Sequence, residues 1–420
     1  MKKVFESSEK ASYDFWGQYI FINSEKKLFE EQLISNNPLN VHDVNTILLH
    51  EYRHWIDHVG TLYGQYLLLG IYRGMEYSLY QAPFDIHPFS PLVIEQELNR
   101  NNLIKIDKIE TLTSNKIEDL WSFYCKDNIL GKYPIQTMHF KSPLGYEICS
   151  TPILYSSLFE TNAVSEELHY YSHFSKEFYK NNKSAKLFED QMYYRSFAER
   201  TYNSNLIVYS SSTHFIASIF ELPHVLNSYY VASQICTILL NLTSNHLNML
   251  MSHLMKGNTN HYHVHYVRNR DFGYLLLRVC LEYKKVQKGN THFDPIEFLN
   301  FFGLPKLDVM ENDIVEEMRN GIKMIPKTSI LFKRFNKLID LGIDVFQTIG
   351  INGKKKEVLT CYFEGKYLDF IPLIYSDEMW DCLSLNDLKS LETINFRENW
   401  YCLVNYLYSI AQKNLKIITQ

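Results

Sequence analysis

Several features are scarce or missing in this chain, and each narrows what the protein can be. Glycine and proline number only 16 and 12 in 420 residues, which favours a mostly helical protein. The seven cysteines are odd in number and form no C-x-x-C pair. This pattern favours free, buried thiols in a reducing compartment over a disulfide framework.

Blocks of charge and long apolar runs are missing as well. The net charge is -5 and no long lysine or arginine block occurs, so no nucleic-acid partner is expected. No run approaches the roughly 18 apolar residues of a transmembrane helix, and the N-terminal residues lack the apolar region of a secretory signal. We therefore expect a cytoplasmic protein with no membrane partner, with non-classical secretion left open.

The residues that are present predict a sizeable core and a mainly α (α+β) fold. The chain is 46% hydrophobic, and apolar residues at helical spacing dominate its length. The expected helices include 41–58, 62–81, 156–180 and 185–203, with helical parts in 90–130. Extended structure is expected within 13–24, 131–152 and 204–212, and a hairpin within 351–373. We expect a boundary near residue 290, with 1–290 as one domain, an insertion at about 80–150, and 291–420 as a helical C-terminal region.

One short stretch carries recognisable chemistry. Residues 47–64, ILLHEYRHWIDHVGTLYG, contain the pattern H-E-x-x-H at His50, Glu51 and His54. On a helix, positions i and i+4 share one face, so both imidazoles can point at one metal ion. Glu51 is rotated by about 100° from His50, beside the ion, where a general base must stand to take a proton from metal-bound water. Asn40 is the expected N-cap of this helix and Gly60 its stop.

The segment resembles the active-site helix of the zincin metallopeptidases, in which a strand precedes the motif helix. The resemblance implies a zincin-like catalytic core with a small N-terminal sheet, surrounded here by a large helical body. It also implies one Zn²⁺ ion bound by His50 and His54, with Glu51 as the catalytic base. Because Asp57 and Gly60 stand where the metzincin subclass has glycine and histidine, that subclass does not fit.

A hydrolytic zinc site needs a third protein ligand and an open position for water. His58 lies about 12 Å along the helix axis from His50, too far for one ion. Two later glutamates are candidates. Glu160 is favoured because E-x-x-A at Glu160 and Ala163 is similar to the third-ligand helix of many gluzincins, where a small residue allows close helix packing. Glu76, 22 residues after His54, is the alternative.

Other side chains could support the site. Asp57 follows His54 by one turn and could orient a ligating histidine or make a surface contact. Several side chains could donate a hydrogen bond to the oxyanion of a reaction intermediate: Tyr194, Arg195, Arg200 and His214. A structural role is the simpler expectation for each of them. Three alternating histidines could form a rival metal site: His261, His263 and His265. The alternative is that they belong to an exposed polar segment.

Together these patterns predict a zinc-dependent endopeptidase of gluzincin type that acts on a protein or peptide substrate. By analogy, the large helical surround suggests a selective protease, such as a bacterial effector, toxin or defence protease. A non-catalytic helical binding protein with structural zinc or no metal is the alternative, and a zinc hydrolase of a non-peptide bond is a third possibility.

Overall fold

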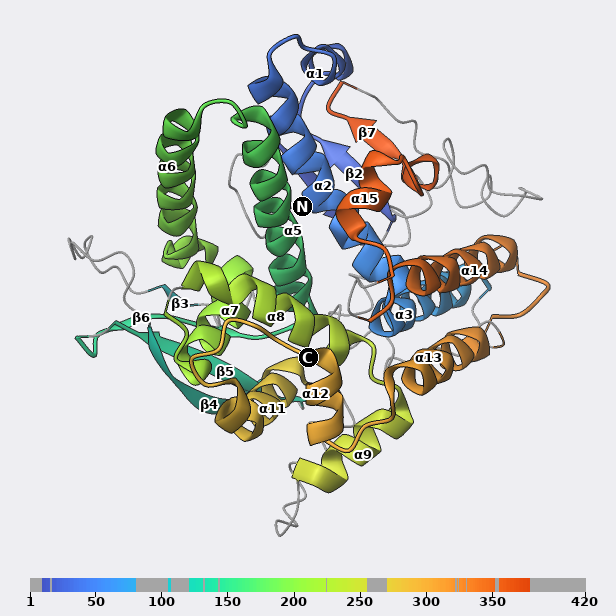
Figure 1. The fold of residues 1–420 in the computed structure, drawn as a ribbon. Helices are drawn as coiled ribbons and strands as arrows, with labels where there is room; N and C mark the ends of the chain where they lie inside the picture. The colour runs from blue at the N-terminus through green and yellow to red at the C-terminus, as the bar shows by residue number, and fades with distance from the viewer. Residues whose placement is uncertain are drawn as a thin grey trace. The chain divides into compact units, whose positions relative to one another are not determined.

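The computed structural model describes residues 10–80, 105–106, 121–254, 270–351 and 355–377, apart from 16, 131–132, 143, 224, 322, 324 and 330. In this part of the chain the fold is mainly helical with small sheets, as the sequence predicts (Figure 1). The chain divides into two compact units. Unit 1 comprises Met1–Ile94 and Asp313–Gln420, and unit 2 comprises Glu95–Asn312.

Unit 1 is built on a three-stranded sheet and a group of long helices. Strand β1 (Ala11–Asp14) pairs antiparallel with β2 (Tyr19–Ile22), which pairs parallel with β7 (Leu373–Tyr375). The remaining elements are helical: α1 (Lys26–Leu33), α2 (Pro38–Gly60), α3 (Leu62–Tyr80), α14 (Phe332–Ile349), α15 (Val358–Phe363) and the short η4 (Leu368–Phe370). The parallel β2–β7 pair therefore joins the two ends of the described chain in one sheet.

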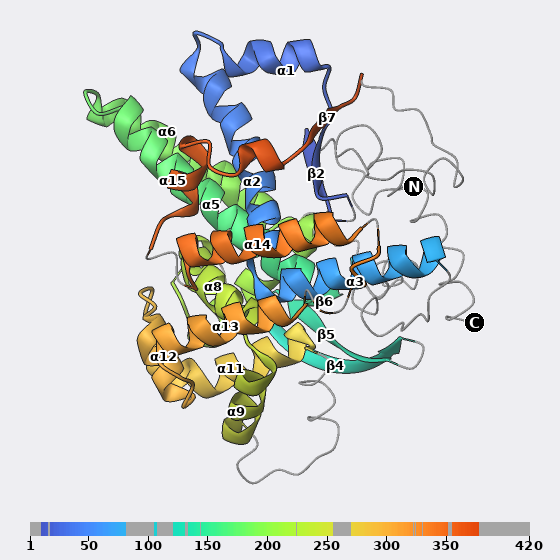
Figure 2. The same cartoon turned by 90° about the vertical axis from the view of Figure 1, so that its right-hand side faces the viewer.

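The long helix α2 is held by close contacts with α14 (Figure 2). A Cβ atom on Gly342 of α14 would overlap the backbone carbonyl oxygen of Val59. A Cβ atom on Gly60 of α2 would likewise overlap the side chain of Val345. Glycine at both positions lets the backbones of α2 and α14 approach each other closely.

Unit 2 combines a four-stranded antiparallel sheet with helices. The strands run in the order β3 (Lys105–Ile106), β6 (Glu147–Pro152), β5 (Tyr133–Lys141) and β4 (Ser122–Leu130). The helices are α5 (Tyr155–Phe178), α6 (Lys183–Thr201), α7 (Ile207–Phe220), α8 (Val225–Leu240), α9 (Ser244–Leu254), α11 (Phe272–Gln287) and α12 (Pro295–Phe301), with η2 (Ser204–Leu206) and the start of α13 (Leu307–Gly321). Aromatic contacts such as Phe123–Phe215, with ring centroids 4.6 Å apart, pack the sheet against α7.

Three sequence predictions of local structure are wrong, each because tertiary packing overrides local propensity. Residues 204–212 were expected to be extended, yet α7 begins at Ile207 and is buried between α5 and α8. Residues 122–130 end the interval that was expected to be helical in parts, yet they form β4, whose partner β5 begins three residues after β4 ends. The expected hairpin at 351–373 contains the helix α15.

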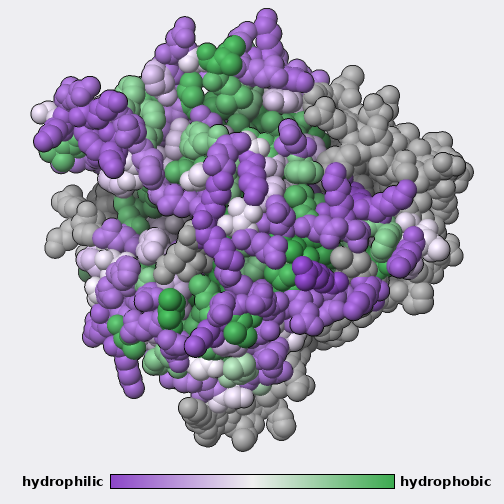
Figure 3. All heavy atoms as spheres, turned by 45° about the vertical axis from the view of Figure 1, so that its right-hand side comes forward, coloured by the Kyte–Doolittle hydropathy of each residue, from purple (hydrophilic) through white to green (hydrophobic). Residues whose placement is uncertain are grey.

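None of the helices in the described part of the chain combines the length and the apolar composition that a membrane span needs. On the face shown in Figure 3, hydrophobic residues form separate areas between hydrophilic ones.

Candidate metal centre

The motif helix α2 begins and ends at different residues from those the sequence predicts. Its N-cap is Asn37, whose side chain accepts a hydrogen bond from the backbone N–H of Leu39, and Pro38 occupies the first turn. The prediction of Asn40 as N-cap is therefore wrong, since Asn40 lies inside the helix. Proline is favoured at this first position because its missing N–H would have no partner there. Gly60 is the last helical residue and serves the packing described above rather than a left-handed stop.

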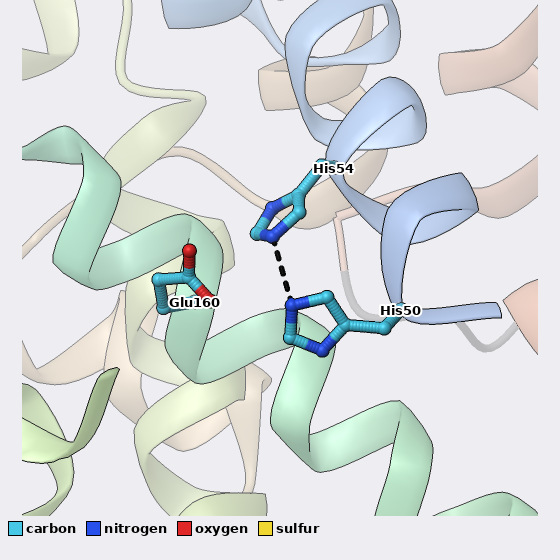
Figure 4. A group of neighbouring side chains, drawn as sticks. All are labelled: His50, His54 and Glu160. Atoms are coloured by element: carbon cyan, nitrogen blue, oxygen red, sulfur yellow. Dashed lines mark hydrogen bonds between the residues drawn. The ribbon is translucent and has the colours of Figure 1, made fainter. Parts of the chain in front are cut away.

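The two motif histidines are brought together on α2. Their Nε2 atoms lie 3.0 Å apart, and the rings meet edge to face with centroids 4.7 Å apart (Figure 4). Two nitrogen ligands at 2.0–2.1 Å from a tetrahedral zinc ion are separated by roughly 3.3 Å. The pair therefore needs only a small adjustment to bind one ion through both Nε2 atoms.

Glu51 lies beside this pair on the next position of the helix. Its side chain is 7% exposed, and His54 is 4% exposed. A carboxylate that is shielded from bulk water interacts more strongly with a neighbouring charge, because the local dielectric is low. Glu51 thus combines a position directly after His50 on α2 with shielding from bulk water.

His58, excluded as a ligand by helix geometry, has a different role. It is fully buried, and its Nδ1 lies 3.0 Å from the hydroxyl of Tyr13 in β1. Burial lowers the pKa of His58 to about 3, so the ring is neutral at neutral pH. The ring of Tyr13 also stacks on His54, with centroids 6.5 Å apart, and Phe15 contacts both histidine rings. Tyr13 of β1 and Phe15, just after the strand, thus place two aromatic rings against His54 and His58 of α2.

Asp57 forms an ion pair within α2. It is 1% exposed and accepts hydrogen bonds from Arg53, at 3.1 Å from Nε and 3.0 Å from Nη2. The prediction of a surface contact for Asp57 is wrong. Arg53 lies one helical turn before Asp57, so the ion pair is contained within α2.

Glu160 lies in the second turn of α5, in unit 2, where it is partly buried (Figure 4). The orientation of α5 is set inside that unit. The Ser233 hydroxyl of α8 donates a hydrogen bond to the side-chain oxygen of Asn162, at 2.9 Å. Ala163, one turn after Glu160, is fully buried.

Glu76, the alternative third ligand, is used elsewhere in unit 1. It lies on α3, is 8% exposed, and accepts a hydrogen bond from the hydroxyl of Ser329. Burial raises the pKa of its carboxyl group. Among the described residues of unit 1, no third histidine, cysteine, aspartate or glutamate offers a ligand atom within 4.8 Å of both motif histidines. Glu76 therefore does not complete the site.

The side chains offered by the sequence as oxyanion donors all lie in unit 2 and have structural partners there or are exposed: Tyr194, Arg195, Arg200 and His214. His214 is buried, stacks on Trp121 with centroids 4.1 Å apart, and has its Nε2 2.8 Å from the carbonyl oxygen of Thr201. Both arginines form ion pairs with glutamates of the same unit. The rival histidine cluster at 261–265 lies outside the described residues.

Sequence reasoning missed Tyr13, and no local signal could have found it, because its partner His58 is 45 residues away. It also missed a second histidine pair on α5, His169 and His173, although the H-x-x-x-H spacing is visible in the sequence.

No family model, no curated protein and no solved structure matches this chain.

Proposed function

We propose that the protein is a zinc-dependent peptidase in which His50, His54 and Glu160 bind one Zn²⁺ ion. The observation that carries the proposal is the histidine pair of α2, with its Nε2 atoms 3.0 Å apart and Glu51 beside it. The resemblance to gluzincins adds the carboxylate of Glu160 as the expected third ligand, which would complete a donor set of two imidazoles and one carboxylate. Three such ligands with an open fourth position are the donor set of hydrolytic zinc sites.

The chemistry follows from the donor set. When bound, zinc supplies a Lewis acid that lowers the pKa of a water molecule and polarises a carbonyl group. Glu51 accepts the proton of the attacking water and returns it to the leaving amine, as a general base and then a general acid. Tyr13 and Phe15 hold the ring of His54 in place, and Asp57 forms an ion pair with Arg53.

A protein or peptide substrate is part of the proposal and derives from the resemblance of the motif to zincins. So does the assignment as a selective protease, such as a bacterial effector or defence enzyme.

The test compares Glu51→Gln with the wild type on a mixture of proteome-derived peptides, with cleavage read by mass spectrometry. Glutamine keeps the size of the side chain but cannot take the proton, so cleavage is expected to fall by about 10²–10⁴-fold. The zinc content should stay unchanged, because Glu51 is not a ligand. An unchanged cleavage rate in a zinc-loaded variant would refute the mechanism.

A matched pair on α5 tests the third ligand. Glu160→Gln should lower both zinc affinity and cleavage, whereas Glu177→Gln, an exposed glutamate on the same helix, should change neither. If zinc stays bound and no peptide is cleaved by the wild type, the alternative of a helical binding protein with structural zinc is favoured.

A further inference from the structure

A second pair of histidines on α5 repeats the geometry of the motif pair. His169 and His173 are four residues apart, and their Nε2 atoms lie 3.2 Å apart, with ring centroids 4.8 Å apart. The separation of roughly 3.3 Å that a tetrahedral metal ion imposes on two nitrogen ligands is almost the same. Both imidazoles thus present the same nitrogen atom toward one point on the surface of the helix.

A carboxylate on the same helix can orient one of these rings. The Oε2 atom of Glu166 lies 3.6 Å from Nδ1 of His169, on the opposite side of the ring from Nε2. Ligating histidines commonly give their other ring N–H to a carboxylate, which fixes the tautomer and makes the ligating nitrogen a better donor. At 3.6 Å this is an ion-pair contact rather than a hydrogen bond, and a small shift of either side chain would bring the Glu166 carboxylate within hydrogen-bonding distance of Nδ1, on the side of the ring away from Nε2.

We propose that His169 and His173 form a second binding site for a divalent transition-metal ion, separate from the catalytic one. His169 lies nine residues after Glu160, which is about 13.5 Å along the helix axis and about half a turn around it. One ion cannot serve both positions. The inference uses only residues of unit 2 and does not depend on the proposed function.

The nature of the site follows from its ligands. Imidazole nitrogen suits zinc, nickel and copper, whereas magnesium and calcium prefer oxygen ligands. The side chain of His169 is 36% exposed and His173 is an exposed residue, so an ion can enter from solvent and water can fill its other positions. Such a site exchanges its metal readily, and a bound ion ties two successive turns of the helix that carries Glu160.

The experiment measures zinc per chain by elemental analysis after dialysis against micromolar Zn²⁺. The wild type should hold about two ions, and H169A and H173A about one each, because the site needs both imidazoles. Peptide cleavage should be unchanged in these two variants. H50A should lose the other ion, and H292A, which removes a lone exposed histidine, should lose none.

Two outcomes would overturn the inference. The first is a wild-type content of one ion that only H50A removes. The second is a second ion that persists in H169A and H173A but is lost when His261, His263 and His265 are replaced together. Loss of cleavage in E51Q or H50A bears on the catalytic centre alone, so failure of the proposed function and failure of this site give different patterns.

Discussion

Replacing Tyr13 by phenylalanine tests how β1 supports the histidine face of α2. The variant keeps the ring that stacks on His54 and removes only the hydroxyl, 3.0 Å from Nδ1 of the fully buried His58. The Nε2 atom of His58 has no hydrogen-bond partner among the described residues, so the variant leaves the ring without any. Leaving a buried polar group unsatisfied costs about 1–3 kcal/mol. Urea denaturation of the metal-free protein should show a loss of that size.

A double-mutant cycle separates this hydrogen bond from packing. His58→Leu alone should also cost stability, because it leaves the Tyr13 hydroxyl buried without a partner. The double variant, Tyr13→Phe with His58→Leu, removes both polar groups and should cost less than the sum of the single changes by about 1 kcal/mol or more. Additive losses would refute the hydrogen bond as the link between β1 and α2.

Three further predictions concern stability. Burial lowers the pKa of His214 to about 4, so this group makes the free energy of unfolding of the wild type fall as the pH drops from about 6.5 to 4. His214→Phe lacks this loss. Between pH 7 and pH 4.5, its free energy of unfolding, measured by urea titration, should therefore rise by about 2 kcal/mol relative to that of the wild type. Gly342→Ala should lower the free energy of unfolding by about 1–3 kcal/mol, although alanine is the better helix former, because its Cβ overlaps the backbone of α2; a stabilised variant in thermal melts would contradict this. Asp57→Asn should lower the free energy of unfolding by about 3 kcal/mol, because it leaves the buried charge of Arg53 without its partner. Adding Arg53→Met removes that charge, so the double variant should recover most of the loss, as measured by urea midpoints.

The class of the fold and the motif helix could be predicted from the sequence because both depend on local periodicity. The apolar spacing and the scarcity of glycine and proline predicted a mainly helical fold. Helix α2 begins at Pro38, three residues before its predicted start. The strand preference of residues 204–212 was misleading. Ile207 and Val208 favour strands in isolation, but α7 packs against α5, α8 and the sheet of unit 2, and most of its residues are buried.

The immediate surroundings of the motif could be predicted only in part, because they depend on contacts between distant residues. Helix geometry alone excluded His58 as a ligand. Helix geometry could not show that Tyr13 would contact His58, or that Arg53 would form an ion pair with Asp57. The choice of Glu160 depended on two residues, Glu160 and Ala163, that match the E-x-x-A pattern of gluzincins.

A crystal structure of the zinc-loaded protein, with anomalous scattering measured at the zinc edge, tests the central proposal most directly. The proposal predicts a zinc ion about 2.0–2.1 Å from Nε2 of both His50 and His54, and about 2.0–2.2 Å from a carboxylate oxygen of Glu160. The fourth position should hold water, with Glu51 next to it. An ion held without Glu160, or closed off by four protein ligands, would contradict the proposal.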